Sequence, residues 1–242
     1  MSDLSAETRD RLTAVSTATL ATVLFKRGLR MQFIQGVQRL SNRPLKLVGP
    51  AFTLRYIPAR EDLDVIEVFR DPDHPQRKAI ETVPSGHVLV MDCRQDHSAA
   101  SAGGILATRA MMRGCAGIVT DGGLRDADEI AELDMPTFSA ARSAPTNLTR
   151  HHAVDINVPV GCGTAPVYPG DIMVGDGDGV IVLPRGIADE VALEAFNQDR
   201  LETFILDEIK GGAALRGTYP PNEATLARFK ASLKGAGGSG AI

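Results

Sequence analysis

The sequence predicts a single α/β domain with a mixed sheet layer, flanked by terminal helices that are free to pack on neighbouring subunits. Short apolar segments typical of buried strands interleave with helical patterns, without the regular βαβ rhythm of a doubly wound sheet. No internal repeat or long linker divides the 242 residues. A chain of this length can bury one sizeable core with a short appended arm.

The N-terminal region, residues 1–30, is expected to form one helix over residues 4–27. Ser5 lies in a cap-like start, apolar residues recur at helical spacing, and Gly28 ends the pattern. The threonine-rich middle of this segment lowers its helix propensity, so tertiary packing is expected to stabilise it.

Residues 31–186 are expected to form the α/β core domain, which would hold the functional site. Its elements are predicted in this order: a strand pair over 46–58 broken near Gly49 and Pro50, a short helix over 60–70, a loop through DPDHPQ, a buried strand over 86–92, a helix starting at Gly103, a buried strand over 115–120, a short strand over 135–140, and short strands with turns over 154–184.

The C-terminal region is expected to be a helical arm over residues 187–233. Apolar residues at helical spacing predict one long helix over 187–209, which Gly211 and Gly212 end, and a further helix over 222–233. The glycine-rich residues 234–242 are predicted to be a flexible tail.

Composition excludes several classes of protein. The net charge of -4 provides no basic surface for nucleic acid. Three widely spaced cysteines fit reduced thiols better than a disulfide framework, and no CxxC motif suggests zinc. The polar N-terminus is unlike a signal peptide, and no run approaches the ~18 apolar residues of a membrane span. We therefore expect a cytoplasmic protein that binds neither membrane nor nucleic acid.

The helix start at Gly103 and Gly104 is a candidate anion site. The amides of Gly104, Ile105 and Leu106 would have no partner within the helix, and such a terminus favours carboxylate or phosphate. The alternative is that the two glycines only relieve crowding at a tight turn.

A second candidate follows the buried strand over 115–120, where ligands of α/β folds tend to bind. Arg125 offers a planar donor pair for a carboxylate or enolate oxygen. Asp126 and Glu129 are one helical turn apart and could face one site, with water completing the shell of Mg²⁺ or Mn²⁺. The alternative is a solvated acidic helix start with an outward salt bridge.

Other polar residues are weaker candidates. His97, beside Asp96, could shuttle protons, but a loop histidine is more often solvated. His151 and His152 are adjacent, so on a regular element their side chains point apart. The sequence contains no Ser-His-Asp order, nucleotide-binding loop or convincing Schiff-base lysine, which agrees with metal-dependent chemistry.

One spacing resembles the signature of class II pyruvate aldolases of the 4-hydroxy-4-methyl-2-oxoglutarate aldolase type. It consists of Gly104, a gap of twenty residues, Arg125 and Asp126, a gap of two residues, and Glu129. This group includes the RraA-like proteins, whose namesake regulates ribonuclease E. The similarity covers roughly residues 12–184, including the PGD and GDGDGV segments. It implies a layered α/β/β/α sandwich that assembles into a homotrimer or homohexamer, with sites near subunit boundaries.

The resemblance also implies roles for individual residues. Asp126 would ligate the divalent metal, and Glu129 would hold it through a water molecule. Arg125 would contact the keto or enolate oxygen of the substrate. The pyruvyl carboxylate would bind the backbone of four consecutive residues, Gly103, Gly104, Ile105 and Leu106.

The function implied is a metal-dependent lyase that cleaves a 4-hydroxy-2-oxo acid to pyruvate and a carbonyl product, with oxaloacetate decarboxylation as a second activity. One alternative is a non-catalytic regulator that binds a ribonuclease. The family's regulators lack an acidic residue at the position of Glu129, so its presence favours catalysis. Another alternative is a metal-dependent lyase or hydratase for a different 2-oxo acid. The segment over 31–46, the charged PAREDLD segment and the C-terminal arm depart from the family pattern, so substrate preference can differ.

Overall fold

The structure is a computed structural model and describes residues 4–236. The helices are α1 (Ala6–Ala14), α2 (Thr17–Lys26), α3 (Pro75–Thr82), α4 (Gly104–Met112), α5 (Ala127–Ala131), α6 (Ala188–Lys210), α7 (Leu215–Thr218) and α8 (Glu223–Ala236), with 3₁₀ helices η1 (Ile66–Arg70), η2 (Asn147–Thr149) and η3 (Arg185–Ile187). The strands are β1 (Gln38–Arg39), β2 (Leu47–Pro58), β3 (Val88–Asp92), β4 (Ala100–Ala102), β5 (Gly117–Leu124), β6 (Thr137–Arg142), β7 (His151–Ile156), β8 (Val160–Cys162), β9 (Ala165–Val167), β10 (Ile172–Gly175) and β11 (Val180–Leu183).

The main sheet is mixed and has the strand order β1-β6-β5-β3-β2-β10-β11. Strands β6, β5, β3 and β2 are parallel, whereas β10 and β11 continue the sheet antiparallel. On its other side from β3, strand β2 pairs with two strands: its first residues pair with β10, and its last residues pair with β7. The long strand β2 therefore belongs to both halves of a curled sheet.

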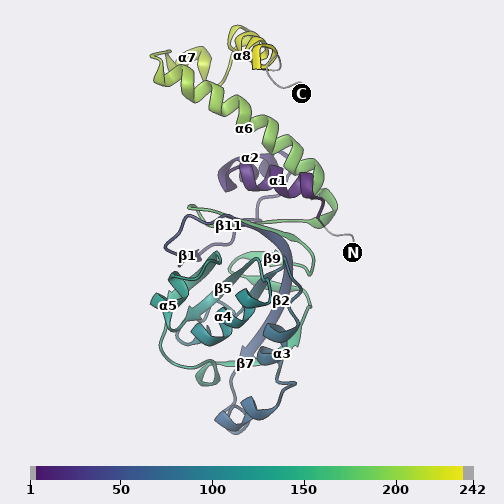
Figure 1. Cartoon of the computed structure of the whole chain (residues 1–242), viewed down its shortest axis with the longest axis vertical. Coiled ribbons are helices and arrows are strands. Elements are labelled where there is room, and N and C mark those ends of the chain that lie inside the picture. The colour runs from purple at the N-terminus through teal and green to yellow at the C-terminus, as the bar shows by residue number, and fades with distance from the viewer. Residues whose placement is uncertain (1–3, 237–242) are drawn as a thin grey trace.

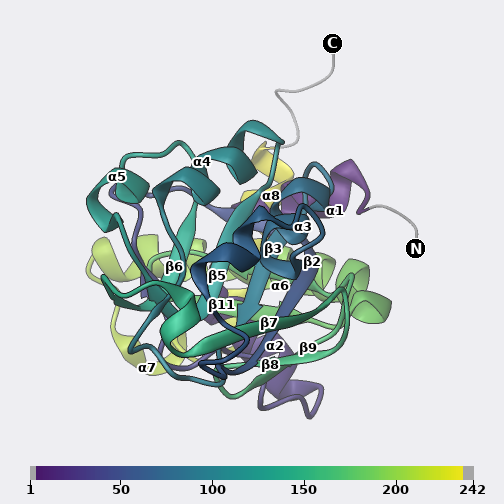
Figure 2. The same ribbon diagram turned by 90° about the horizontal axis from the view of Figure 1, so that it is seen from below.

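Three hydrophobic clusters separate four layers, α/β/β/α, as the family resemblance implied. Helices α3, α4 and α5 cover the parallel strands, and Figure 2 shows them along one side of β2, β3, β5 and β6. Strands β8 to β11 pack on the opposite face. Helices α1, α2 and α6 cover β10 and β11, and α6 then runs away from the body with α7 and α8 at its far end (Figure 1).

The alternation of side chains along the strands produces these layers. In β3, Leu89 and Met91 face the α4 side, whereas Val88 and Val90 face the second sheet layer. All five residues of β3 are buried, so its sequence is apolar except at its carboxyl end, Asp92.

Two of the predicted elements are wrong in detail. Residues 4–27 form two helices, because Ser16 accepts a hydrogen bond from the amide of Thr19 (3.0 Å) and starts a new helix. The strand pair predicted over 46–58 is one continuous strand, β2. Gly49 does not break it, since a Cβ there would lie 2.5 Å from the carbonyl oxygen of Gly86. This glycine permits a close approach within the sheet layer.

The segment between β2 and β3 also differs from the prediction. Only residues 66–70 of the predicted helix over 60–70 are helical, in the 3₁₀ helix η1. The loop through DPDHPQ is shorter than expected, since its last proline, Pro75, begins the helix α3, which the sequence reading missed.

The C-terminal helices agree with the prediction except at their end. The helix α8 reaches Ala236, so the first three residues of the predicted tail are helical, and the remainder lies outside the described residues. The division into residues 1–30, 31–186 and 187–233 stays a prediction. Among residues 4–236 no helix is both long and apolar enough to span a membrane.

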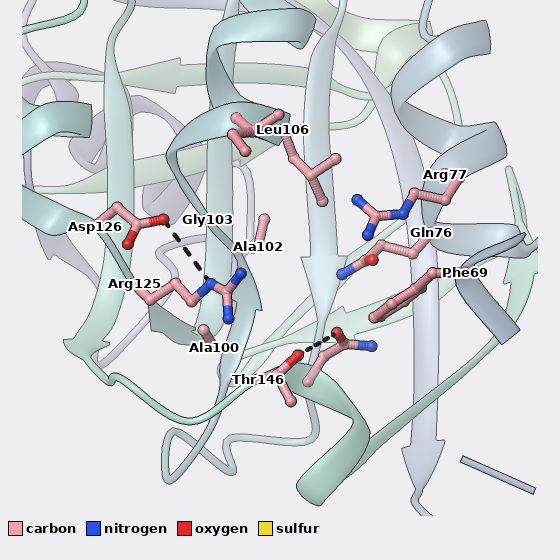
Figure 3. Close-up of a pocket in the computed structure, with 12 residues that line it drawn as sticks. Phe69, Gln76, Arg77, Ala100, Ala102, Gly103, Leu106, Arg125, Asp126 and Thr146 are labelled. Carbon is pink, nitrogen blue, oxygen red and sulfur yellow. Dashed lines mark hydrogen bonds and ion pairs between the residues drawn. The ribbon is translucent and has the colours of Figure 1, made fainter. Parts of the chain in front are cut away.

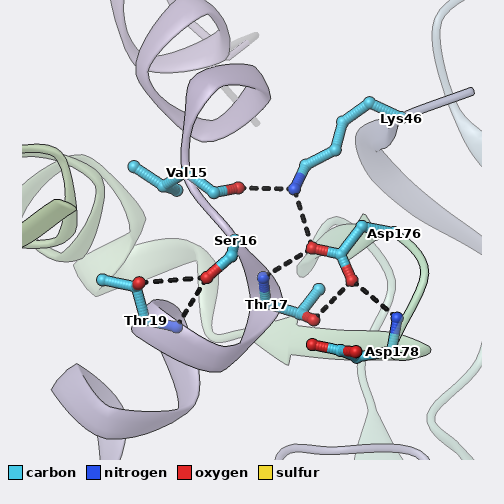
Figure 4. Close-up of polar contacts among 7 residues, drawn as sticks. All are labelled: Val15, Ser16, Thr17, Thr19, Lys46, Asp176 and Asp178. Carbon is cyan, nitrogen blue, oxygen red and sulfur yellow. Dashed lines mark hydrogen bonds and ion pairs between the residues drawn. The ribbon is translucent and has the colours of Figure 1, made fainter. Parts of the chain in front are cut away.

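Asp176, in the turn between β10 and β11, joins the N-terminal helices to the sheet (Figure 4). Its carboxylate accepts hydrogen bonds from the amide and the hydroxyl of Thr17, both at 2.7 Å, and lies 3.1 Å from the ammonium of Lys46. Burial raises the pKa of Asp176, but the hydrogen bonds from Thr17, Asp178 and Lys46 outweigh it, so the pKa lies below its ordinary value.

We predict that Asp176→Asn lowers the free energy of unfolding by about 1–3 kcal/mol at pH 7, because an amide cannot accept all of these hydrogen bonds. Since folding depresses the pKa, the stabilisation is complete above the ordinary value of 3.8 and is lost as the pH falls below it. Urea denaturation at several pH values measures both effects. Asp178→Asn, at an exposed residue of the same turn, is the control, and an equal loss in it would contradict the prediction.

Candidate functional site

The loop after β5 lies against the first turn of α4. Asp126 has a left-handed backbone (φ 57°), which is uncommon for a residue other than glycine. It occupies the N-cap position of α5 but does not cap that helix. Its Oδ2 instead accepts a hydrogen bond from the amide of Gly104 (2.9 Å). Such backbone strain is often found at functional sites.

Gly103 and Gly104 make this contact possible by their lack of a side chain. A Cβ on Gly103 would lie 2.8 Å from Oδ2 of Asp126 and 2.9 Å from Nε of Arg125. A Cβ on Gly104 would lie 2.9 Å from Oε2 of Glu129. The φ of Gly103 is -127°, which any residue can adopt, so the space and not the backbone conformation requires glycine.

A pocket of about 220 Å³ lies beside this contact (Figure 3). Its volume is below the ~300–1,000 Å³ typical of sites for drug-sized ligands, so it suits a small molecule. It is lined by Phe69, Gln76, Arg77, Ala100, Ala102, Gly103, Ile105, Leu106, Arg125, Asp126, Thr146 and Asn147.

The lining carries two guanidinium groups and one carboxylate. Arg125 lies with its Nε 3.8 Å from Oδ2 of Asp126, and about half of each side chain is exposed. The guanidinium of Arg77 lies 4.3 Å from the centre of the Phe69 ring. Burial lowers the pKa of Arg77, and the positive charge of Arg125 lowers it further. A guanidinium carries its positive charge throughout the physiological pH range, so the pocket holds two fixed cations.

The first turn of α4 provides backbone donors at the same pocket. The amide of Gly104 is occupied by Asp126, so of the three predicted helix amides only those of Ile105 and Leu106 are available to a ligand. The first hydrogen bond within the helix runs from the amide of Ala107 to the carbonyl of Gly103 (3.0 Å). The Ile105 side chain is 85% exposed at the pocket.

The residues around Gly104 suit a hard divalent cation. Carboxylates of Asp126 and Glu129 both lie within 4 Å of the point that a Gly104 Cβ would fill. No group of three or more histidine, cysteine or acidic side chains that could hold a metal occurs in the described part of the chain. Two carboxylates with water as the remaining ligands fit Mg²⁺ or Mn²⁺ better than zinc. Their assignment as metal ligands remains a proposal.

The weaker candidates lie away from the pocket. The ring of His97 lies 3.4 Å from the carbonyl of Gln95, and His97 does not line the pocket. His151 is fully buried beside Tyr56, whereas His152 contacts Asp64 at 2.8 Å. The adjacent histidines therefore have different partners, as expected for neighbours on a strand.

The sequence reading missed the opposite wall of the pocket. Gln76 and Arg77 belong to α3, Phe69 to η1, and Asn147 to η2. The proline at the first position of α3, followed by QRKAIET, is a typical helix start and would have revealed this helix. No sequence spacing relates it to Arg125, since only the sheet brings the two segments together.

A larger hollow of about 430 Å³ lies between α2, α6 and α7, away from this site. Its lining is mostly apolar or hydroxyl-bearing, and Glu202 is its charged member. Its described lining residues include no arginine, lysine or histidine, so we assign the candidate chemistry to the smaller pocket.

Comparison with known sequences relates the chain to one family. The model of the family described as RraA-like, Aldolase/RraA, matches residues 15–182. A Halalkalibacterium halodurans protein named as a proposed 4-hydroxy-4-methyl-2-oxoglutarate aldolase is 34% identical over 154 residues, which cover 62% of this chain and 65% of that protein. The chain thus spans less than two thirds of this relative's length.

Solved structures agree with this relationship. An uncharacterized protein from Pseudomonas syringae superposes with a TM-score of 0.76 at 27% identity, covering 90% of this chain and 100% of that one. Streptomyces coelicolor RraAS2, described as an unusual member of the RNase ES inhibitor RraA protein family, superposes with a TM-score of 0.73 at 30% identity, covering 84% and 98%. Both similarities support the mixed α/β fold.

We predict that Gly103→Ala weakens the binding of pyruvate to this pocket by about tenfold or more, because the added Cβ displaces Asp126 and Arg125. Titration calorimetry measures the affinity. Gly161→Ala is the matched control, since a Cβ there meets nothing within 4 Å. Unchanged affinity in Gly103→Ala would show that the close approach does not shape the binding site.

Proposed function

The chain belongs to the RraA-like family, and on this premise we propose that it is a divalent-metal-dependent lyase that cleaves a 4-hydroxy-2-oxo acid to pyruvate and a carbonyl product. One observation carries the proposal: Arg125, Asp126 and the open amides of α4 meet at one small pocket. The name of the Halalkalibacterium relative supports the same reaction class.

Each group has a distinct part in the proposed reaction. The amides of Ile105 and Leu106 would bind the carboxylate of the substrate, since a helix N-terminus favours an anion. Arg125 would donate to the 2-oxo oxygen, where negative charge develops as the bond between C3 and C4 breaks. Its Nε lies 3.8 Å from Oδ2 of Asp126, in the space that Gly103 leaves.

Asp126 would hold the metal directly and Glu129 through a water molecule. When bound, the divalent cation would act as a Lewis acid toward the 2-oxo group. The hydrogen bond from Gly104 to Oδ2 orients the Asp126 carboxylate, which leaves Oδ1 as a further oxygen donor.

Protons must leave the 4-hydroxyl and reach C3 during cleavage. Among the described residues that line the pocket, Asp126 is the only acid, and there is no histidine or lysine. We therefore propose that water carries these protons, with no side chain as the general base. Oxaloacetate decarboxylation places negative charge on the same oxygen, so it is proposed as a second activity.

A non-catalytic regulator of a ribonuclease is the second candidate function. The similarity to RraAS2 favours it, because that protein is described within an RNase inhibitor family. Against it stands Glu129, which a regulator would not need. A metal-dependent lyase or hydratase for another 2-oxo acid shares the same residues, and a panel of substrates would separate it. The trimer or hexamer and the cytoplasmic location stay predictions.

We predict that Asp126→Ala abolishes metal-dependent pyruvate release from 4-hydroxy-2-oxo acids, a loss of about a thousandfold or more, since the cation supplies several kcal/mol. A coupled pyruvate assay with Mg²⁺ or Mn²⁺, with and without EDTA, measures it. Asp128→Asn is the control, because this neighbouring carboxylate pairs with Arg142 at the surface. Full activity of Asp126→Ala in EDTA would refute the mechanism.

We predict that Arg125→Ala lowers kcat by roughly a hundred- to a thousandfold, which is typical of removing one donor to a developing oxyanion. Arg142→Ala, at an exposed arginine on β6, should leave kcat unchanged. Steady-state kinetics on the same substrate test this prediction. A change confined to KM would assign Arg125 to substrate binding alone.

A further inference from the structure

Two guanidinium groups face the pocket from opposite walls. Arg125 projects from the loop after β5, and Arg77 projects from α3 (Figure 3). The proposed reaction gives Arg125 a role and leaves Arg77 without one.

Arg77 is held in place by a built support. Its neighbour Gln76 is buried and donates from Nε2 to the carbonyl of Ser101 on β4 (2.7 Å). The hydroxyl of Tyr56 donates to the same carbonyl (2.9 Å). These bonds tie the first turn of α3 to the sheet, and the Phe69 ring lies against the guanidinium. The backbone of Arg77 is therefore held by α3, and the Phe69 ring restricts its side chain, which lowers the entropy lost when it binds a ligand.

The positive charge of Arg77 is unpaired among the described residues. Within residues 4–236 the guanidinium of Arg77 has no carboxylate partner, although it is partly buried. Its pKa is lowered first by burial and also by the charge of Arg125, so the two cations repel each other across the space. A ligand with a carboxylate at each end would relieve this repulsion and regain hydrogen bonds for both groups.

We propose that Arg77 is a specificity-determining residue that binds a second, distal carboxylate, so that the pocket selects 2-oxo diacids over 2-oxo monoacids. The inference rests on the proposed function for the orientation of the substrate. The 2-oxo end lies at Arg125 and the helix amides, and the distal carboxylate lies at Arg77. A volume of about 220 Å³ holds a short diacid but not a nucleotide or a large cofactor.

A matched pair of ligands tests the proposal without turnover. 2-Oxoglutarate and 2-oxopentanoate share a five-carbon chain and differ in the terminal carboxylate. Calorimetry measures both affinities, with Mg²⁺ and with EDTA, since the chain has no tryptophan for a fluorescence assay. The variants are Arg77→Met and Arg77→Lys. Lys78→Met is the control, because Lys78 is exposed on the same helix and pairs with Asp73.

We expect the wild type to bind 2-oxoglutarate at least about tenfold more tightly than 2-oxopentanoate. Arg77→Met should lower the affinity for the diacid roughly ten- to a hundredfold, the loss expected for a hydrogen bond to a charged group, and should change the affinity for the monoacid little. Arg77→Lys keeps the charge but not the planar donor pair, so its affinity for the diacid should lie between those of the wild type and Arg77→Met. Lys78→Met should behave as the wild type.

Other results overturn the proposal. If the wild type binds both ligands with equal affinity, or if Arg77→Met loses affinity for both equally, Arg77 has only a structural role. Failure of the proposed function gives a different pattern. If no 4-hydroxy-2-oxo acid releases pyruvate but the wild type still prefers the diacid through Arg77, the lyase function is refuted and the diacid site is supported. Equal release from mono- and diacids by the wild type would support the lyase and refute the role of Arg77.

Discussion

The contact between the amide of Gly104 and the carboxylate of Asp126 organises the site, because it joins the start of α4 to the loop after β5. It requires glycine at two successive positions and a left-handed backbone at Asp126. Neither feature is favourable for local structure alone, since glycine has little helix propensity and a left-handed aspartate is strained. The surrounding sheet must stabilise both, so the rigidity of the core is a condition for the geometry of the pocket.

The layered core supplies that rigidity. Strand β5 is buried along its whole length between β3 and β6, and its carboxyl end presents Arg125. Strand β2 pairs with β10 at one end and with β7 at the other, which joins the two sheet layers. The helices α1, α2 and α6 cover the outer layer without lining the pocket, and Asp176 joins the start of α2 to that layer.

The two walls of the pocket differ in how far the sequence could predict them. Arg125, Asp126 and Glu129 are close in the sequence, and their spacing to Gly104 resembles a known signature, so they could be named in advance. Arg77 is about fifty residues from Arg125, and its helix α3 was not predicted, because Pro75, which begins the helix, belongs to the segment DPDHPQ that was expected to be a loop. Only the parallel pairing of β3 with β5 brings α3 and α4 to the same side of the sheet.

The sequence by itself determined the fold class, most of the strands, the long C-terminal helix and the position of the helix start at Gly104. These depend on local patterns of apolar residues and on turn residues, which act over a few neighbours. The tertiary structure decided the continuity of β2 through Gly49, the occupation of the Gly104 amide by Asp126, and the positions of Arg77 and Arg125 on opposite walls of one pocket. Each of these depends on packing between segments far apart in the chain, and no local pattern records such contacts.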